Sequence, residues 1–224
     1  MPKPARKLRG ATPRNPERTR ERILSAALKE FAAHGFAGAR VDAIARRAAI
    51  NKRMLYHYFG DKAALFREVQ RKKISERQAW AENLSDEPAE ALPFWFKAAC
   101  RDKDWIRLLA WEALQGDDGK IIDEKRRLEH VALHLSRLRS RQKRGVISAE
   151  FPTPHVMLAI LSLTMFPMAF PQLTRLVTGR FVHDPLFQSA QVDFLQKFAD
   201  GFRNGKPKSF ARKSGPKSKS RLLT

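Results

Sequence analysis

Residues 41–66 read VDAIARRAAINKRMLYHYFGDKAALF, and this stretch decides the fold. Apolar residues recur at helical spacing from Val41 to Ala48, which predicts a short amphipathic helix. Ala49–Asn51 then form a tight connector, and a second helix of about two turns follows over Lys52–Phe59. Gly60 ends this second helix. Two short helices joined by a tight turn are predicted to form a helix-turn-helix.

The residues on either side complete a three-helix head over residues 17–74. A preceding helix is predicted to end at Gly35, because glycine accepts the left-handed conformation of a C-terminal cap. Asp61 is a natural N-cap for a further helix running toward Trp80. The apolar face of the preceding helix consists of Ile23, Leu24, Ala27, Leu28 and Phe31.

The remaining body, residues 75–203, is also predicted to be helical, so the fold class is all-α with about nine helices. Pro167 and Pro171 are expected to break one apolar helix, because proline lacks a backbone N–H. A buried stripe of Leu128, Val131, Leu135 and Leu138 is expected on another. The predicted body helices are Ala89–Cys100, Lys103–Leu114, Gly119–Lys143, His155–Phe166 and Pro185–Phe202.

The net charge of +21 is unevenly distributed. Residues 75–202 hold equal numbers of acidic and basic side chains, so the excess lies in the head and both tails. Residues 1–16 and 204–224 are predicted to be a disordered basic arm and a disordered basic tail. A surface of this kind favours a polyanion, either nucleic acid or an anionic membrane surface. Each tail is expected either to contact DNA or simply to solubilise the chain.

The cellular compartment follows from what the sequence lacks. No apolar run reaches the length of about 18 residues that a transmembrane helix needs, so no membrane partner is expected. The basic N-terminus has no apolar segment typical of a secretory signal. Cys100 is a single cysteine and has no partner for an internal disulfide. These features predict a cytoplasmic protein.

The second helix of the motif is short enough that only its beginning and its exposed face can reach bases in the major groove of DNA. Arg53 is the best candidate for reading a guanine edge through two hydrogen bonds, worth roughly 1–3 kcal/mol of discrimination. Lys52 is expected to contact a phosphate or a base with less selectivity. The predicted reading surface comprises Asn51, Lys52, Arg53, Met54 and His57.

Several motifs at fixed spacing resemble the tetracycline-repressor (TetR) family of bacterial regulators, over residues 18–70. The resemblance implies that Tyr56 and Lys62 contact phosphates and that the body binds a small inducer. It also favours repression over activation. The motifs are Gly35-Phe36, Val41-Asp42-Ala43-Ile44-Ala45, Leu55-Tyr56-His57-Tyr58-Phe59 and Asp61-Lys62-Ala63-Ala64-Leu65-Phe66.

The sequence departs from the family pattern in three places. Ala49 stands in the turn where the family commonly has glycine. Ala39 and Arg40 replace the usual threonine cap, so Arg40 is expected to contact a phosphate through its charge. Arg53 and Met54 are large where small residues are usual. An operator sequence therefore cannot be transferred from a relative.

Aromatic and thioether side chains are dense in the body, and the resemblance favours an apolar effector pocket among them rather than plain core. The alternative, that each packs in the core, is the commoner role of such residues. The candidate ligand-binding residues are Trp95, Trp105, Trp111, Met165 and Phe166.

The last helix is predicted to form a homodimer interface together with part of His155–Phe166. A two-fold dimer would place two reading helices about one DNA turn apart, on a palindromic operator. The alternative is that the same aromatic face packs inside one subunit. The candidate interface residues are Phe187, Phe194, Leu195 and Phe198.

No catalytic residues, cofactor or metal are predicted, since the chain has no phosphate-binding glycine loop or nucleophile elbow. His130 and His134 have the spacing of a helical metal-binding pair, but no third ligand supports them. The function predicted is a sequence-specific DNA-binding repressor, released from double-stranded operator DNA by a small hydrophobic effector. The alternative is a nonspecific, architectural DNA-binding protein, whose charge would be spread over the whole molecule.

Overall fold

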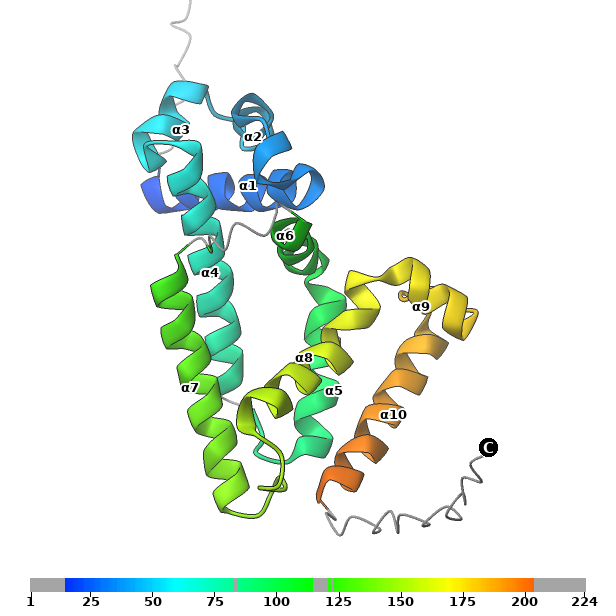
Figure 1. Cartoon of the computed structure of the whole chain (residues 1–224). Coiled ribbons are helices and arrows are strands. Elements are labelled where there is room, and N and C mark those ends of the chain that lie inside the picture. Colours follow the sequence, from blue (N-terminus) through cyan, green and yellow to red (C-terminus); the bar gives the residue numbers. More distant parts are fainter. Residues whose placement is uncertain (1–14, 83, 115–120, 122, 204–224) are drawn as a thin grey trace, which may run out of the picture.

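The computed structural model describes residues 15–82, 84–114, 121 and 123–203. Over these residues the chain is helical and has no strand, which confirms the all-α prediction (Figure 1). The described helices are α1 (Pro16–Gly38), α2 (Val41–Arg47), α3 (Lys52–Phe59), α4 (Lys62–Glu82), α5 (Pro88–Arg101), α6 (Lys103–Leu114), α7 (Glu124–Lys143), α8 (Thr153–Ala169), α9 (Pro171–Thr178) and α10 (Pro185–Arg203).

The head forms around the apolar faces of α1, α2 and α3, which meet the first turns of α4. Ile23, Ile44 and Leu55 are fully buried there, one from each of the first three helices. The rings of Phe31 and Phe66 pack edge to face with centroids 4.9 Å apart, which fixes α4 against α1. Figure 1 shows α2 and α3 on the side of α1 that faces away from the body.

The first helix begins at Pro16, one residue before the predicted start of the head. The Oδ1 atom of Asn15 accepts a hydrogen bond from the backbone N–H of Glu17 at 3.0 Å, and Pro16 occupies the first turn. Such a cap satisfies a donor that the helix leaves unpaired. The structured head therefore starts within the arm expected at residues 1–16. The rest of that arm and the tail at 204–224 lie outside the described residues.

Helix α4 connects the head to the body, so the predicted boundary after residue 74 falls inside a continuous helix. Lys72 forms an ion pair with Glu21 of α1, which ties α4 to the head. Lys73 is largely buried and pairs with Asp102 at 2.8 Å, which ties the same turn to the end of α5. Helix α4 is therefore joined by ion pairs to both the head and the body.

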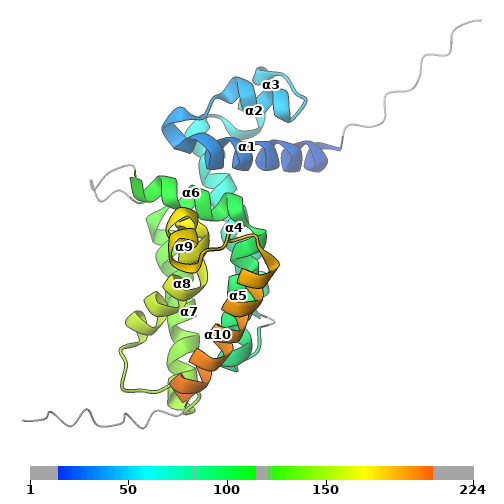
Figure 2. The ribbon, with the colours of Figure 1, turned by 90° about the vertical axis from the view of Figure 1, so that its right-hand side faces the viewer.

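The body packs α5 between α8 and α10, with α6 crossing beneath the head (Figures 1 and 2). Phe96 of α5 and Phe187 of α10 are both buried, and their ring centroids lie 6.3 Å apart. Leu108 of α6 and Leu195 of α10 complete this core.

Helix α7 differs from its prediction. It begins at Glu124, whereas residues 119, 120 and 122 of the predicted helix lie outside the described part of the chain. Only Leu138 of its apolar stripe is buried, while Leu128 is 59% exposed and Val131 is also exposed. The predicted buried stripe was therefore wrong, because Leu128 points to solvent and Val131 lines a cavity of the body.

Two prolines shape the turn from α8 to α9. Pro167 lies inside α8, and Pro171 begins α9, so the expected break falls at Phe170 and a separate short helix follows it. No single helix in the described ranges is long and apolar enough to cross a membrane. The pair α8–α9 reaches that length and composition together but is bent by 91°.

Candidate nucleic-acid interface and ligand cavity

The start of α3 is fixed by Asn51, whose Oδ1 accepts a hydrogen bond from the backbone N–H of Met54 at 2.8 Å. This cap occupies the Asn51 side-chain oxygen. Lys52 is also engaged, because its Nζ lies 3.1 Å from a carboxylate oxygen of Asp42 on α2. That hydrogen bond raises the pKa of Lys52 above its ordinary value. In the free protein Asn51 therefore caps α3, and Lys52 joins α3 to α2.

The turn between α2 and α3 contains a backbone conformation that disfavours most side chains. Ala49 has φ of 50°, in the left-handed region where glycine is usual. The guanidinium of Arg22, on α1, donates hydrogen bonds to the carbonyl oxygens of Ala48 and Ala49. The turn is thus braced from the helix beneath it.

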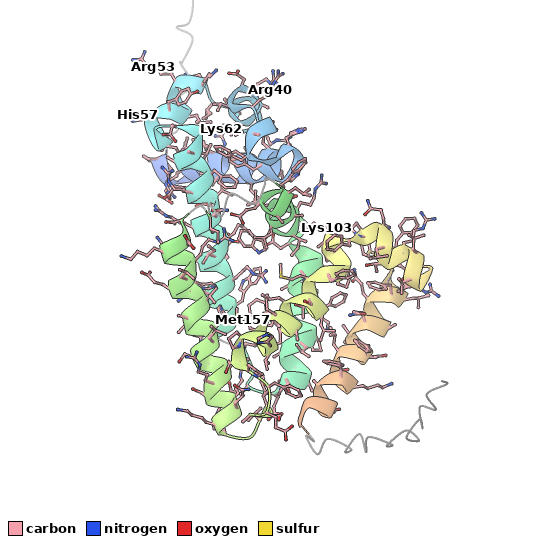
Figure 3. All side chains as sticks on the ribbon, in the orientation of Figure 1. Arg40, Arg53, His57, Lys62, Lys103 and Met157 are labelled. Carbon is pink, nitrogen blue, oxygen red and sulfur yellow. The ribbon has the colours of Figure 1, made fainter. Side chains whose placement is uncertain are left out.

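The exposed side chains of α3 include Arg53, Tyr56 and His57, while Met54 is half-buried. Figure 3 places Arg53 and Arg40 at the end of the head furthest from the body, with His57 on the outer side of α3. Arg53 forms no hydrogen bond or ion pair with another described residue and points outward (Figure 3), as a side chain that reads a base edge must.

Four of the predicted DNA-contacting residues line one hollow beside α3. Arg40, Lys52, Tyr56 and Lys62 surround it, together with Arg46 of α2. The Nζ of Lys62 donates to the carbonyl oxygen of Ala37 at 3.2 Å and lies 5.0 Å from the centre of the Phe36 ring. Sequence analysis missed Arg46, although its position opposite the apolar face of α2 marks it as exposed.

A cavity of about 310 Å³ lies in the body, lined by parts of α4, α5, α6, α7, α8 and α10. Trp95, Trp105 and Met165 line it, among the residues proposed from the sequence for ligand binding. Phe166 does not, since its side chain turns outward and is 43% exposed. Met157 of α8 also lines the cavity, and Figure 3 shows it between α7 and α5.

Trp111 does not line the cavity either. Its indole Nε1–H donates to the carbonyl oxygen of Ala32 at 3.2 Å, so it joins α6 of the body to α1 of the head. From the sequence alone, Trp111 could line a cavity of the body or contact the head. The packing of α6 across α1 places it in the contact with the head.

The polar lining of the cavity comes mainly from α4 and α7. His130 and His134 lie on one face of α7 with their Nε2 atoms 3.1 Å apart. Burial lowers the pKa of both rings, that of His134 to about 4, and the nearby arginines add to the effect. Arg77 and Arg137 also line the cavity, and their types and spacing in the sequence gave no sign of it.

The structure corrects two of the predicted interface residues. Phe187 and Leu195 are buried within one subunit, at 4% and 0% exposure, so they belong to its core. Phe198 is half-buried and lines the cavity. Phe194 is 47% exposed and remains available on the outer face of α10. The apolar face of α10 is broad, so one part of it packs in the core of the subunit and another part is exposed.

An exposed, basic helix-turn-helix on a charge-neutral helical body defines a DNA-binding transcriptional regulator. Residues 23–69 match the family described as bacterial regulatory proteins, tetR family, and residues 94–185 match the tetracyclin repressor-like C-terminal domain. The chain belongs to the TetR family. Regulators of this type bind DNA operators and act as dimers.

The similarity to individual relatives extends over most of the chain. The HTH-type transcriptional repressor SCO4008 of Streptomyces coelicolor is 34% identical, over 74% of this chain and 86% of the relative. The repressor NicS of Pseudomonas putida is 33% identical, over 70% and 79% respectively. The crystal structure of the regulator SCO4942 of Streptomyces coelicolor has a TM-score of 0.65 and 27% identity, over 80% of this chain and 97% of its own.

Proposed function

We propose that this protein is a homodimeric repressor that binds a palindromic operator and is released when a small, largely apolar molecule occupies the body cavity. The observation that carries the proposal is the position of α4. This helix lines the cavity through Ile74 and Arg77 and also packs in the head through Phe66. Ligand binding and DNA binding therefore share one rigid element, which is what coupling between two sites requires.

Operator recognition is assigned to α3 and the hollow beside it. Arg53 reads a base edge, with His57 and Met54 next to it on the exposed side of the helix. Phosphate contacts, which fix the register of the head on the duplex, are assigned to side chains of the hollow, namely Arg40, Arg46, Tyr56 and Lys62. Lys52 exchanges its Asp42 partner for DNA. Asn51 acts through the cap it provides to α3.

The dimer interface is assigned to the outer faces of α8 and α10, which meet where the side-chain amide of Gln191 on α10 donates a hydrogen bond to the carbonyl oxygen of Leu163 on α8 at 3.4 Å. Figure 2 views the molecule from this side. Large apolar side chains are exposed here, and patches of this kind mark protein–protein contacts. They include Leu158, Leu161, Leu186 and Phe194.

Repression is assigned because both relatives with more than 30% identity are named repressors. A repressor needs only to cover its operator, and no surface for recruiting another protein is required. The site of action is then the cytoplasm, where the DNA is.

A nonspecific architectural DNA-binding protein is the alternative. Such a protein needs charge over its whole surface and no cavity. Here residues 75–202 have no net charge, and the cavity adjoins the helix that carries the head. Both observations favour a regulator with an effector.

Selection of bound sequences from a random duplex pool tests operator recognition. A palindrome with half-sites about one helical turn apart is the expected product. Recovery of sequences without a shared site would support the architectural alternative. The Arg53→Ala variant, run in parallel, should recover the same palindrome with one position relaxed.

A thermal-shift screen of hydrophobic metabolites and drugs tests the effector, since a ligand that binds only the folded state raises the melting temperature. Compounds that stabilise the protein should also release the selected operator. The Trp105→Ala variant should lose both responses. A stabilising compound that leaves the operator complex intact would contradict regulation through this cavity.

A further inference from the structure

The cavity has an unusual wall, because α7 turns a basic face toward it. Residues 127, 130, 134, 137 and 141 follow one another at helical spacing and are Arg, His, His, Arg and Arg. The apolar side chains Leu128 and Leu133 point to solvent instead. Val131 and Leu138 of α7 line the cavity as well, so this wall carries basic side chains with two apolar ones among them.

Two of these arginines already have acidic partners. Arg127 pairs with Glu112 at 2.5 Å, and Arg141 pairs with Asp86 at 3.1 Å. Asp86 is the acidic residue among the described side chains that line the cavity, and it also pairs with Arg144. The positive charge of the wall is therefore only partly neutralised by the protein.

Two further arginines line the cavity, Arg137 of α7 and Arg77 of α4, and each has one unpaired nitrogen atom. The Nη1 atoms of Arg77 and Arg137 are buried and have no hydrogen-bond partner among the residues that the structure describes. The Cζ atom of Arg77 lies 5.0 Å from the centre of the Trp95 ring, so the face of the guanidinium stacks on an aromatic partner. This contact gives the buried Nη1 atom no hydrogen-bond acceptor. The nearby carboxylate of Asp102 pairs with Lys73 at 2.8 Å. A buried unpaired donor is costly, and a charged one more so, so such groups in a binding site indicate a missing acceptor.

The two histidines also favour an anion as the missing acceptor. Burial, together with the nearby arginines, lowers the pKa of both His130 and His134 and so disfavours their charged forms. An anion beside them reverses that effect, so one ring is able to take up a proton and donate a hydrogen bond. The opposite wall of the cavity is apolar and includes Trp105, Ile160 and Met165.

We propose that the cavity binds an amphipathic organic anion, with its acidic group between Arg77 and Arg137 and its apolar part against Trp105 and Met165. The proposal rests on the proposed function, in that this anion is then the effector. The guanidinium groups supply the paired N–H donors that suit a carboxylate, sulfonate or phosphate. A cavity of about 310 Å³ suits a small molecule.

A matched pair of fluorescent probes tests the acidic group. The two probes, 8-anilinonaphthalene-1-sulfonate and N-phenyl-1-naphthylamine, share their apolar rings and differ in the sulfonate. The full-length protein is expected to bind the sulfonate at least roughly tenfold more tightly, because hydrogen bonds to charged groups contribute that much. Equal affinity for the two probes, or no binding of the sulfonate, would overturn the proposal.

Substitution of single arginines tests which side chains bind the sulfonate. Arg137→Gln and Arg77→Gln should each weaken sulfonate binding roughly tenfold while neutral-probe binding is retained, which also reports an intact cavity. Arg139→Gln is the matched control, because it removes the same charge from the exposed side of α7. An equal loss in Arg139→Gln would assign sulfonate binding to surface charge and overturn the proposal.

Operator release, measured with the same probes, separates the two proposals. Tight sulfonate binding through Arg77 and Arg137 without release of DNA would contradict regulation by the cavity and leave the anion site supported. Release by the neutral probe alone would contradict the anion as effector and leave regulation supported.

Discussion

Gly35 of the head and Trp111 of the body are in direct contact. Gly35 has φ of 67°, and a Cβ atom built on it would lie 3.0 Å from Cε3 of the Trp111 ring. The nearby Nε1–H of the same indole donates to Ala32 at 3.2 Å. The close approach of α1 and α6 thus depends on a residue without a side chain.

Gly35→Ala is therefore expected to destabilise the protein by about 1–3 kcal/mol, from strain at positive φ and from overpacking. Urea unfolding measures the difference. Gly38→Ala is the matched control, because its Cβ would meet His34 at 3.4 Å, an ordinary contact distance. A similar loss in both variants would mean that the contact with Trp111 is not the cause.

Ala49→Gly is expected to stabilise the head by up to about 1 kcal/mol. Ala49 has φ of 50°, a conformation that costs an L-residue roughly 1–2 kcal/mol and glycine far less. Thermal or urea unfolding checks the sign. Ala43→Gly, in the middle of α2, should instead destabilise by about 1 kcal/mol. A loss of stability in Ala49→Gly would argue that Arg22 already compensates the strain.

Arg46→Ala and Arg53→Ala should weaken DNA binding in different ways. Loss of a phosphate contact at Arg46 lowers affinity for all sequences and reduces the slope of log K against log salt by about 0.9. Loss of Arg53 should relax one base position, by roughly 1–3 kcal/mol of discrimination. Titrations at several salt concentrations, with specific and random duplexes, distinguish the two. Identical behaviour of the variants would show that these roles are misassigned.

Phe194→Glu and Leu158→Glu should each raise the dimer dissociation constant at least roughly tenfold, since a buried, unpaired charge at an interface is costly. Both side chains are exposed in the subunit, so the fold should survive. Sedimentation gives the oligomeric state. Leu128→Glu, on the exposed side of α7, is the control. A dimer that persists in the first two variants would place the interface elsewhere.

Acid should destabilise the protein through His134. Burial lowers its pKa from 6.5 to about 4, so between these values the unfolded chain binds more protons than the folded one. The free energy of unfolding therefore falls as the pH drops through this window. Between pH 7 and pH 5, the free energy of unfolding of His134→Gln should fall by about 1 kcal/mol less than that of the parent protein. Urea unfolding at the two pH values measures this.

Arg139→Gln is the control for that prediction, because it changes an exposed residue of the same helix and leaves every histidine in place. It should keep the pH dependence of the parent protein. An unchanged pH dependence in His134→Gln would show that other groups are responsible.

The helix-turn-helix could be predicted closely, because the signals for it are local. The apolar spacing of Val41–Ala48, the cap at Asn51 and the stop at Gly60 all act within a few residues. The structure places α2 and α3 within a residue of those bounds. The exposed position of Arg53 follows from the same periodicity.

The body was less predictable at the level of single residues. Phe187 and Leu195 share an apolar face with Phe194, yet two of them lie in the core and one on the surface. Periodicity shows which face of a helix is apolar, but it does not show what covers that face. The outcome depended on α5, which lies far away in the sequence.

The sequence by itself determined the helical class, the reading helix and the location of the excess charge, since each depends on neighbouring residues. Only the tertiary structure decided that Trp111 joins the head to the body and that Arg77 of α4 lines one cavity together with Arg137 and the histidines of α7. Such relationships arise when helices distant in sequence pack together. Their side chains acquire burial and unmet hydrogen-bonding capacity only in that packing.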